Sequence, residues 1–382
     1  MPLLSPPASG GALLDISHGK SRVAVHEKLA SIQALRGVAI LLVVLRHMKV
    51  YEGRYSHDQL LPSMAVVGDA GVDLFFAVSG FVMMTTTRSS FGKNGAVLDF
   101  IYKRITRIYP LYWIFSLVIL PLYLTHPEMV NSSRHGLPIN LPASFLLWPQ
   151  AYMPLLGQGW TLVHEMYFYG VFSLALLWGE KGSRRYFSIW AVLLGLAGLV
   201  NYANPGLLDI PVWKLVTHPL TFEFIGGVVV AKIFYRGKDD FAIPALLSGI
   251  ALMLVGSLLN PIDGDPSWRR RAVLYGIPAL LVLYGTVSIE RRYGARFPKS
   301  LLFIGDSSYS VYLTHILVIA SIGRIWATFR QDGMLDNIAV LLAMLAAAVA
   351  TGALSYQFLE RPMQKFFSDL RTRALRVWGA SH

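Results

Sequence analysis

The chain has 382 residues, of which only 15% are charged, and it contains no cysteine. Soluble domains carry roughly a quarter charged residues, so this shortage excludes an ordinary water-soluble enzyme and a disordered protein. The lack of cysteine excludes disulfides, thiolate zinc sites and a cysteine nucleophile. The net charge of +12 would indicate nucleic acid only if the basic residues formed one patch. They are spread over many loops, so we expect a polytopic membrane protein with no nucleic-acid partner.

A membrane-spanning helix needs about 20 mostly apolar residues, and ten segments meet or approach this requirement. They are 32–50, 66–86, 109–126, 158–178, 186–203, 215–235, 241–260, 272–289, 300–326 and 336–359. We therefore predict an all-α fold, a polytopic membrane helix bundle of about ten transmembrane helices. The transmembrane domain is expected over residues 31–362, between an N-terminal tail at 1–30 and a C-terminal tail at 363–382.

The distribution of Lys and Arg predicts the orientation of this bundle, because cytoplasmic loops are enriched in both residues. If the N-terminus is cytoplasmic, roughly two thirds of the 34 Lys and Arg residues fall in inner segments. This predicts that both termini, and therefore both tails, are cytoplasmic. It also explains the positive net charge as a topological signal.

Arg36 and His47 make the first predicted span a candidate functional helix, since ionisable groups at membrane depth are costly. They are eleven residues apart, which is close to three helical turns, so both lie on one face roughly 16 Å apart along the axis. That face would offer a cation for an anionic group and an imidazole for proton transfer. The structural alternative is that Arg36 extends to the inner interface and His47 caps the outer end.

Carboxylates in other spans are expected to lie near His47. Asp73 in the second span is deep enough to need a partner, for which an imidazole or arginine on the first helix is the natural choice. Glu165 in the fourth span lies at about the depth of His47 and would orient its imidazole. His164 points about 100° away from Glu165, so both cannot face one partner. Glu223 in the sixth span has comparable depth, but nothing specific surrounds it in the sequence.

A second polar group is predicted at the inner side. The basic, aromatic segment 102–110 is explained most simply by loop charge and interfacial aromatic residues. The alternative is an anion site in which Arg104 and Arg107 bind phosphate. The polar first half of the ninth span, 304–315, indicates a helix that lines a cavity or is buried against protein. An anion site inside and an acid–base site outside suit group transfer across a membrane, and proton-coupled transporters share this layout.

Several motifs in register resemble the acyltransferase family 3 membrane proteins, from about residue 32 to 362. The form Trp-Thr-Leu-x-x-Glu is most similar to the branch that O-acetylates bacterial exopolysaccharides. The motifs are Leu35-Arg36-Gly37 with His47, Gly71-Val72-Asp73-Leu74-Phe75-Phe76 with Ser79-Gly80-Phe81, Arg104-Ile105-Thr106-Arg107-Ile108-Tyr109-Pro110, Trp160-Thr161-Leu162 with Glu165, the run from Gly305 to His315, and Glu360-Arg361-Pro362.

The resemblance implies an O-acetyltransferase that uses acyl-CoA, typically acetyl-CoA, as a cosubstrate from the cytoplasm. The acceptor would be a hydroxyl of a polysaccharide or of a lipid-linked oligosaccharide, and the protein would lie in the lipid bilayer of the bacterial inner membrane. Arg36, with Arg104 or Arg107, would hold the phosphates of acetyl-CoA. No metal is expected.

The resemblance also implies roles in the chemistry. His47 would act as general base on the sugar hydroxyl or as a transient acyl carrier, oriented by Glu165 or Asp73. The histidine assignment stays open between His47 and His164, and the arginine spacing favours His47.

Candidates for contacting the substrate are Trp160, Ser79 and Tyr309. Ser79, Ser307 and Tyr309 are the candidate oxyanion donors. Two other classes of function fit the same topology. One is a proton-coupled exporter of sugar, lipid or drug, and the other is a non-catalytic subunit of a polysaccharide assembly complex.

Overall fold

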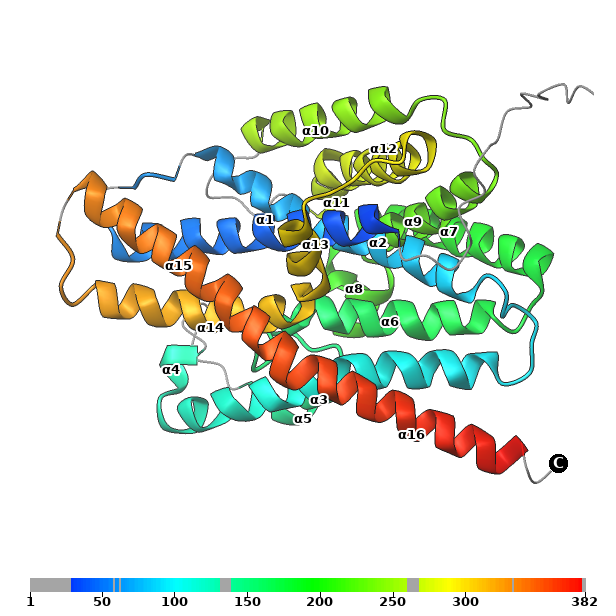
Figure 1. Ribbon diagram of the computed structural model, residues 1–382, viewed down its shortest axis with the longest axis horizontal. Coiled ribbons are helices and arrows are strands. Elements are labelled where there is room, and N and C mark those ends of the chain that lie inside the picture. The colour runs from blue at the N-terminus through cyan, green and yellow to red at the C-terminus, as the bar shows by residue number, and fades with distance from the viewer. Residues whose placement is uncertain are drawn as a thin grey trace, which may run out of the picture.

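The structure, a computed structural model, describes residues 29–57, 59–61, 63–130, 139–259, 268–331 and 333–379. Every regular element in these ranges is a helix, and no strand occurs in them. The predicted all-α bundle is therefore confirmed (Figure 1). The helices are α1 (Ala30–Tyr55), η1 (Ser63–Asp69), α2 (Ala70–Thr87), α3 (Ala96–Thr125), α4 (Pro127–Val130), α5 (Leu141–Phe145), α6 (Gly159–Ala175), α7 (Glu180–Ala203), η2 (Pro205–Asp209), α8 (Pro211–Val216), α9 (Leu220–Tyr235), α10 (Ala242–Leu259), α11 (Trp268–Arg271), η3 (Ala272–Gly276), α12 (Ile277–Tyr293), α13 (Lys299–Asp306), α14 (Ser308–Trp326), α15 (Met334–Ser355), η4 (Tyr356–Glu360) and α16 (Arg361–Gly379).

The membrane-spanning helices agree with the ten predicted segments. Nine helical segments in the described chain are long and apolar enough to cross a membrane. The remaining predicted span, 158–178, is α6, which is shorter at 17 residues and lies within the same bundle (Figure 1). The protein is thus a multi-pass membrane protein.

The boundaries of three spans differ from the prediction. The ninth span, 300–326, is broken at Ser307 into α13 and α14, because Ser307 leaves the helical conformation there. Helix α3 begins at Ala96, well before residue 109. Helix α15 continues through the π-helix η4 into α16, so residues 363–379 of the predicted C-terminal tail are helical. Of the predicted N-terminal tail, residues 1–28 lie outside the described residues.

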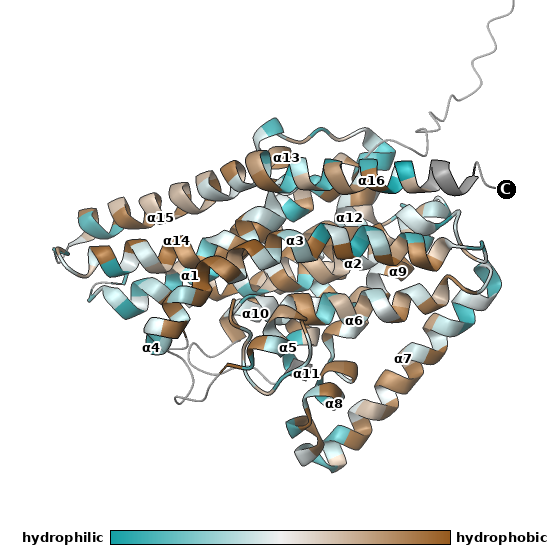
Figure 2. Cartoon of the chain, turned by 90° about the horizontal axis from the view of Figure 1, so that it is seen from below, coloured by the Kyte–Doolittle hydropathy of each residue, from teal (hydrophilic) through white to brown (hydrophobic). Residues whose placement is uncertain are grey.

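Helices at the centre of the bundle differ from those at its edge in how much surface they bury. In its most apolar stretch, the segment Ala65–Thr87 has 67% of its residues buried, against 22% for Glu180–Ala203. Figure 2 shows the second of these segments, α7, running obliquely apart from the other long helices, with many hydrophobic residues along it. A helix that is apolar on its outward side suits contact with lipid. Helices α1, α2, α9, α12 and α14 each have more than half of the corresponding stretch buried and therefore form the centre of the bundle.

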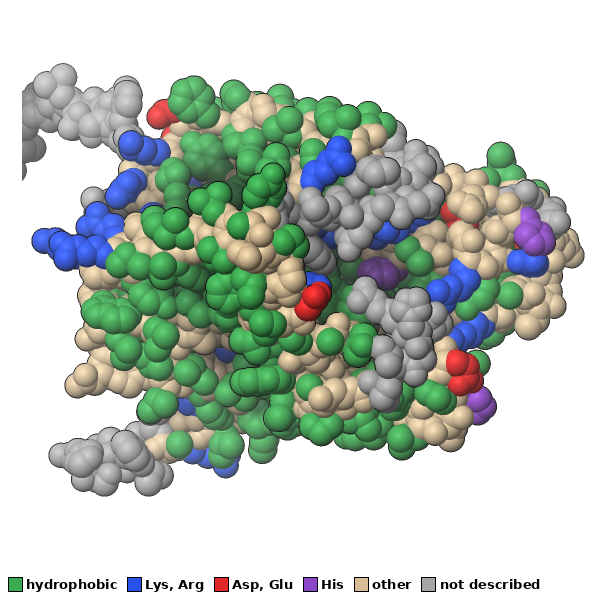
Figure 3. All heavy atoms as spheres, turned by 180° about the vertical axis from the view of Figure 1, so that it is seen from behind, with side chains coloured by type: hydrophobic (Ala, Val, Ile, Leu, Met, Phe, Trp, Pro, Cys, Tyr) green, Lys and Arg blue, Asp and Glu red, His purple; other side chains and the backbone are tan. Residues whose placement is uncertain are grey.

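The ends of the bundle carry most of the charged side chains. Figure 3 shows hydrophobic side chains over the middle of one face, with Lys and Arg gathered toward the two ends. At one end, the backbone N–H of Ala30 donates to Glu290 at 2.8 Å, and Arg371 pairs with Asp99. These contacts join the start of α1 to the last turn of α12, and the start of α3 to α16, which ends at the right of Figure 1. We call this the α16 end.

Candidate active site

A cavity of about 110 Å³ lies between α1, α2, α3, α6 and α14. Four charged side chains from three of these helices line it: Arg36, Arg104, Arg107 and Glu165. The three arginines predicted to bind the donor are therefore brought together, although up to 71 positions separate them in the sequence. The rest of the lining is largely apolar or aromatic. We call this space the arginine cavity.

Arg36 reaches the arginine cavity because α1 and α13 pack backbone to backbone. A Cβ atom placed on Gly305 would lie 1.9 Å from the carbonyl oxygen of Gln33, so only glycine permits this approach. The close contact sets the start of α14 beside α1. Arg36 then donates from Nη2 to Oγ of Ser308 at 2.9 Å and from Nη1 to Gln33 at 3.2 Å. The break at Ser307 thus supplies a hydroxyl to the guanidinium.

Arg104 and Arg107 lie three residues apart on α3, so they share one helix face. The guanidinium of Arg104 lies over the rings of Phe100 and Tyr169, 5.2 and 5.3 Å from their centroids. Its Nη2 donates to Thr86 at 3.4 Å, whereas its buried Nε has no partner among the described residues. Arg107 makes no hydrogen bond and no ion pair among the described residues. Both guanidinium groups therefore keep donors for an anion.

Glu165 lies in the arginine cavity and not beside His47. Its carboxylate accepts a hydrogen bond from the hydroxyl of Tyr169, four residues later on α6. The expectation that Glu165 lies next to His47 is therefore wrong. Equal depth in two spans does not imply contact, because the rotation of each helix decides which neighbour a side chain faces.

A second cavity, of about 370 Å³, adjoins the first, and Arg104 and Arg107 line both. Its other walls come from the end of α2, the first turns of α3 and the helix α16. Helix α16 contributes Gln364, Ser368 and Arg371, none of which the sequence singled out. In the sequence, the only sign of this contribution from α16 is the high proportion of polar residues after residue 362. We call this space the α16 cavity.

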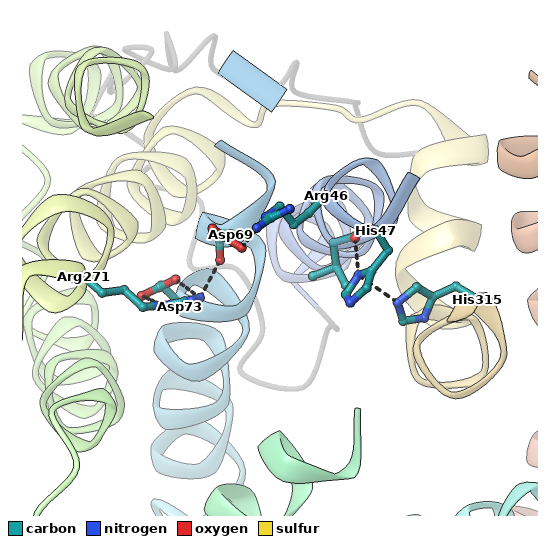
Figure 4. Close-up of polar contacts among 7 residues, drawn as sticks. Arg46, His47, Asp69, Asp73, Arg271 and His315 are labelled. Atoms are coloured by element: carbon teal, nitrogen blue, oxygen red, sulfur yellow. Dashed lines mark hydrogen bonds and ion pairs between the residues drawn. The ribbon is translucent and has the colours of Figure 1, made fainter. Parts of the chain in front are cut away.

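His47 contacts a second histidine, His315 of α14 (Figure 4). Nδ1 of His47 lies 3.3 Å from Nε2 of His315, and the ring centroids are 4.8 Å apart with an edge-on geometry. His315 is fully buried. The sequence had placed it in a motif but had assigned it no role. The ring of Tyr312, which lines the arginine cavity, lies 5.7 Å from that of His315.

The partners of the two histidines determine which nitrogen carries hydrogen. Nδ1 of His315 lies 2.8 Å from the carbonyl oxygen of Tyr312, which can only accept, so Nδ1 is the donor and Nε2 of the neutral ring is an acceptor. Nδ1 of His47 faces that acceptor and lies 2.9 Å from the carbonyl oxygen of Val43. It therefore also carries hydrogen. The lone pair of neutral His47 remains on Nε2.

Asp73 pairs with Arg271 and not with a residue of the first helix. Nη2 of Arg271 donates to Oδ2 of Asp73 at 2.9 Å and to the carbonyl oxygen of Asp69 at 2.8 Å. Figure 4 shows Asp73 directed toward Arg271, on the side of α2 away from His47. The expected contact with α1 is therefore wrong. Arg271 directly precedes the predicted span 272–289, and the turn α11 folds it back against α2.

The predicted substrate-contact residues fall in two places. Ser79 and Tyr309 line the arginine cavity, where the Tyr309 hydroxyl donates to the carbonyl oxygen of Ile108 at 2.7 Å. Trp160 is not part of that lining, and its ring lies 5.8 Å from that of His164. His164 itself packs against His218, with ring centroids 4.4 Å apart. Among the described residues, no group of three or more His, Asp or Glu is placed to hold a metal ion.

The helical membrane fold and a buried arginine-rich cavity suit the class of membrane enzymes that transfer a group from an anionic donor. A family model described as an acyltransferase domain, of acyltransferase family 3, matches residues 29–356. The chain therefore belongs to this family and is a membrane O-acyltransferase. The resemblance indicated by the sequence motifs is confirmed.

Three curated proteins are similar to the chain. The chain is 30% identical to exopolysaccharide production protein ExoZ of Rhizobium meliloti strain 1021, over 81% of this chain and 92% of that one. It is 25% identical to acyltransferase MdmB of Streptomyces mycarofaciens, over 90% and 94%. It is 23% identical to peptidoglycan O-acetyltransferase OatA of Listeria monocytogenes, over 91% of this chain but 58% of the relative. No solved structure matches the chain.

Proposed function

We propose that the protein transfers an acetyl or other small acyl group from acyl-CoA to a hydroxyl of an exopolysaccharide or of its lipid-linked precursor. The similarity to an exopolysaccharide production protein over 92% of that relative supports the acceptor class. The α16 end carries many Lys and Arg residues, which favours a cytoplasmic location for that end. The protein would thus lie in the bacterial inner membrane with both termini cytoplasmic, and the donor would enter from the α16 end.

The donor would occupy both cavities. Phosphate groups would lie where the α16 cavity meets the arginine cavity, since Arg104 and Arg107 line both and keep free donors. Guanidinium groups bind phosphate through paired N–H donors. Arg36 would bind an anionic or carbonyl oxygen further in. The pantetheine arm would follow the apolar lining at Phe75 and Phe76 toward Tyr312.

His47 would act as the general base in direct transfer. Its Nε2 removes the proton from the acceptor hydroxyl as that oxygen attacks the thioester carbonyl carbon. A carbon–oxygen bond forms, the carbon–sulfur bond breaks, and the proton passes from His47 to the leaving thiolate. An acyl-histidine intermediate would use the same Nε2 lone pair.

His315 is proposed as a positioning residue for His47. Its Nε2 accepts from Nδ1–H of His47, which fixes the ring and favours the imidazolium that forms during transfer. A carboxylate has this task in the Ser–His–Asp triad. His315 replaces Glu165 and Asp73 in the proposal, because neither carboxylate contacts His47. Glu165 would instead balance the charge of the arginines.

Ser79 is proposed as an oxyanion donor because it lines the arginine cavity. Tyr309 is less suited to that task, since its hydroxyl hydrogen already binds the Ile108 carbonyl oxygen. Trp160 is proposed to contact the acceptor from outside the arginine cavity. Asp73 has no proposed role in the transfer itself.

The observation that carries the proposal is the convergence of three arginines on one cavity, whose lining residue Tyr312 has its ring 5.7 Å from that of His315. The test uses isolated membranes and acetyl-CoA labelled in the acetyl group. We expect label in polysaccharide or lipid-linked sugar with the wild type and none with His47→Ala at equal protein level. Substrate movement without consumption of acetyl-CoA would contradict the proposal and favour an exporter.

A further inference from the structure

Glu223 of α9 is a buried carboxyl group to which the proposed transfer assigns no task. Only 2% of the residue is exposed. Neither carboxylate oxygen has a hydrogen-bond partner among the described residues. A buried ionised carboxylate without hydrogen bonds is costly. Its surroundings must therefore explain how it is tolerated.

Glu223 faces Asp73 of α2 and lies against the π-helix η3. Electrostatic contacts connect it to Asp73 and to Arg271. A Cβ atom placed on Gly276 would lie 2.7 Å from Oε1 of Glu223, so the carboxyl group rests on the backbone of η3. One helical turn further along α9, a Cβ on Gly227 would lie 2.0 Å from the carbonyl oxygen of Ala77. Backbones this close leave no room for water between α2 and α9 at that point.

The charges around Glu223 do not balance if both carboxyl groups are ionised. Arg271 is the one cation described in contact with them, and its Nε and Nη2 already bind the carboxylate of Asp73. Asp69, nearby on the same side of α2, has its own partner in Arg46 at 3.1 Å. Helix α10, which packs against η3, carries no ionisable residue. Two carboxylates and one guanidinium would leave a net negative charge in a dry interior.

His218 does not supply the missing positive charge. It is buried and lies just before α9. Its Nδ1 accepts from the backbone N–H of Leu220 at 3.2 Å, so this nitrogen carries no hydrogen.

A single proton shared by the two carboxyl groups removes both the missing hydrogen bond of Glu223 and the unbalanced negative charge. A carboxylate that faces another carboxylate can form a hydrogen bond only if one of them carries hydrogen. We propose that Asp73 and Glu223 form a proton-binding site, in which Glu223 carries the proton and donates it to Asp73 while Arg271 is the counter-ion. The group of three is then neutral. The inference does not depend on the identity of the acyl donor or acceptor.

The proton site is connected to the helix that carries His47. Arg271 binds both Asp73 and the carbonyl oxygen of Asp69, and the carboxylate of Asp69 binds Arg46. Loss of the proton would leave Glu223 competing with Asp73 for Arg271. The charge state of the site would thus act on the contacts next to His47.

Infrared spectroscopy of the purified protein in lipid nanodiscs tests the site directly. A protonated carboxyl group has a carbonyl stretching band that an ionised carboxylate lacks. We expect this band in the wild type and its loss in Glu223→Gln. The matched control is Glu52→Gln, because Glu52 is fully buried but accepts from the backbone N–H groups of Leu60 and Leu61. An unchanged band in Glu223→Gln would overturn the proposal.

A further variant separates a shared proton from simple burial. Asp73→Asn leaves Glu223 alone with Arg271, so Glu223 should ionise and the band should disappear. A band that persists in Asp73→Asn would show that Asp73 does not hold the proton in place and would overturn the paired site.

Thermal unfolding against pH gives an independent measurement. The wild type should lose stability as rising pH removes the proton, because both carboxylates then face a single cation. Glu223→Gln should lack this loss, since its amide N–H still donates to Asp73, and its transfer activity should stay within about two-fold of the wild type. Glu223→Met, which cannot donate, should yield less folded protein than Glu223→Gln. Identical pH dependence in the wild type and Glu223→Gln would contradict the proposal.

Discussion

Among the described residues, two pairs of histidines lie ring against ring inside the bundle, and their surroundings differ in a way that separates chemistry from packing. In the His47–His315 pair, backbone carbonyl oxygens fix the hydrogen on each Nδ1, and one Nε2 lone pair is left over. In the His164–His218 pair, the ring centroids are 4.4 Å apart with the planes tilted by 57°, and Nδ1 of His164 has no partner among the described residues. Aromatic rings of Trp160 and other residues surround that second pair.

The difference teaches that a histidine at membrane depth is a candidate base when hydrogen bonds orient it and a lone pair stays available. His47 meets both conditions. His164 fills space among aromatic rings, and its Nδ1 has no hydrogen-bond partner among the described residues to orient the ring. Neither pair belongs to the lining of the arginine cavity, so the hydrogen bonds, and not the cavity, distinguish them. The comparison therefore favours His47 in the choice that the sequence left open. Substitutions of His47, His315 and His164 test this comparison, and a substitution of Arg107 tests the arginine cavity.

His47→Gln should give the largest effect. Glutamine approximates the size of histidine but cannot take a proton, and general base catalysis contributes about 10²- to 10⁴-fold. We expect transfer of labelled acetyl to fall by that amount while the protein remains in the membrane at the wild-type level. Activity within a few fold of the wild type would exclude His47 as the base and direct attention to His164.

Arg107→Gln should weaken donor binding. Its guanidinium makes no hydrogen bond or ion pair among the described residues, and it lines both cavities. The variant therefore removes donors for an anion without breaking an ion pair. Loss of a hydrogen bond to a charged group costs about 1.5–3 kcal/mol, equivalent to roughly a 10- to 100-fold rise in KM for acetyl-CoA. Steady-state kinetics in membranes would measure it. Arg373→Gln, on the exposed face of α16, is the control and should leave KM unchanged.

His315→Leu should have a smaller effect, about 10-fold on kcat, because it removes the acceptor that orients His47 but leaves the base itself. KM for both substrates should change little. His315→Gln should restore part of the rate, since its amide oxygen can accept from Nδ1–H of His47. Equal loss in the leucine and glutamine variants would indicate a packing role for His315.

His164→Phe should have the smallest effect. The substitution removes a buried nitrogen that lacks a hydrogen bond and keeps an aromatic ring among aromatic neighbours. Replacing buried polar atoms by apolar ones of similar shape is nearly neutral. We expect transfer within about two-fold of the wild type and little change in the unfolding temperature in detergent. A large loss of activity with normal stability would contradict the comparison between the two pairs.

The sequence predicted the helical spans and several site residues well, for reasons that are local. Apolar stretches of about 20 residues identify spans because lipid leaves backbone polar groups no partner outside the helix. The spacing of Arg36 and His47 places both on one face because helical geometry is regular. The polar run 304–315 correctly indicated a helix that faces a cavity, which Ser308, Tyr309 and Tyr312 line.

Contacts between spans were not predictable in the same way. The sequence placed Asp73 and Glu165 beside His47, and the structure places neither of them there. It found nothing around Glu223, which lies between Asp73 and η3. Each of these contacts joins positions far apart in the chain, such as Asp73 and Arg271, which are 198 residues apart.

The sequence by itself thus determined that this is a helical membrane protein, which residues lie at membrane depth, and which motifs resemble an acyltransferase. The tertiary structure decided which of those residues meet. Hydropathy and helical periodicity depend only on residues within about 20 positions of each other. The rotation and spacing of packed helices depend on close backbone contacts such as that of Gly305 with Gln33, and these join distant segments that no single stretch of sequence specifies.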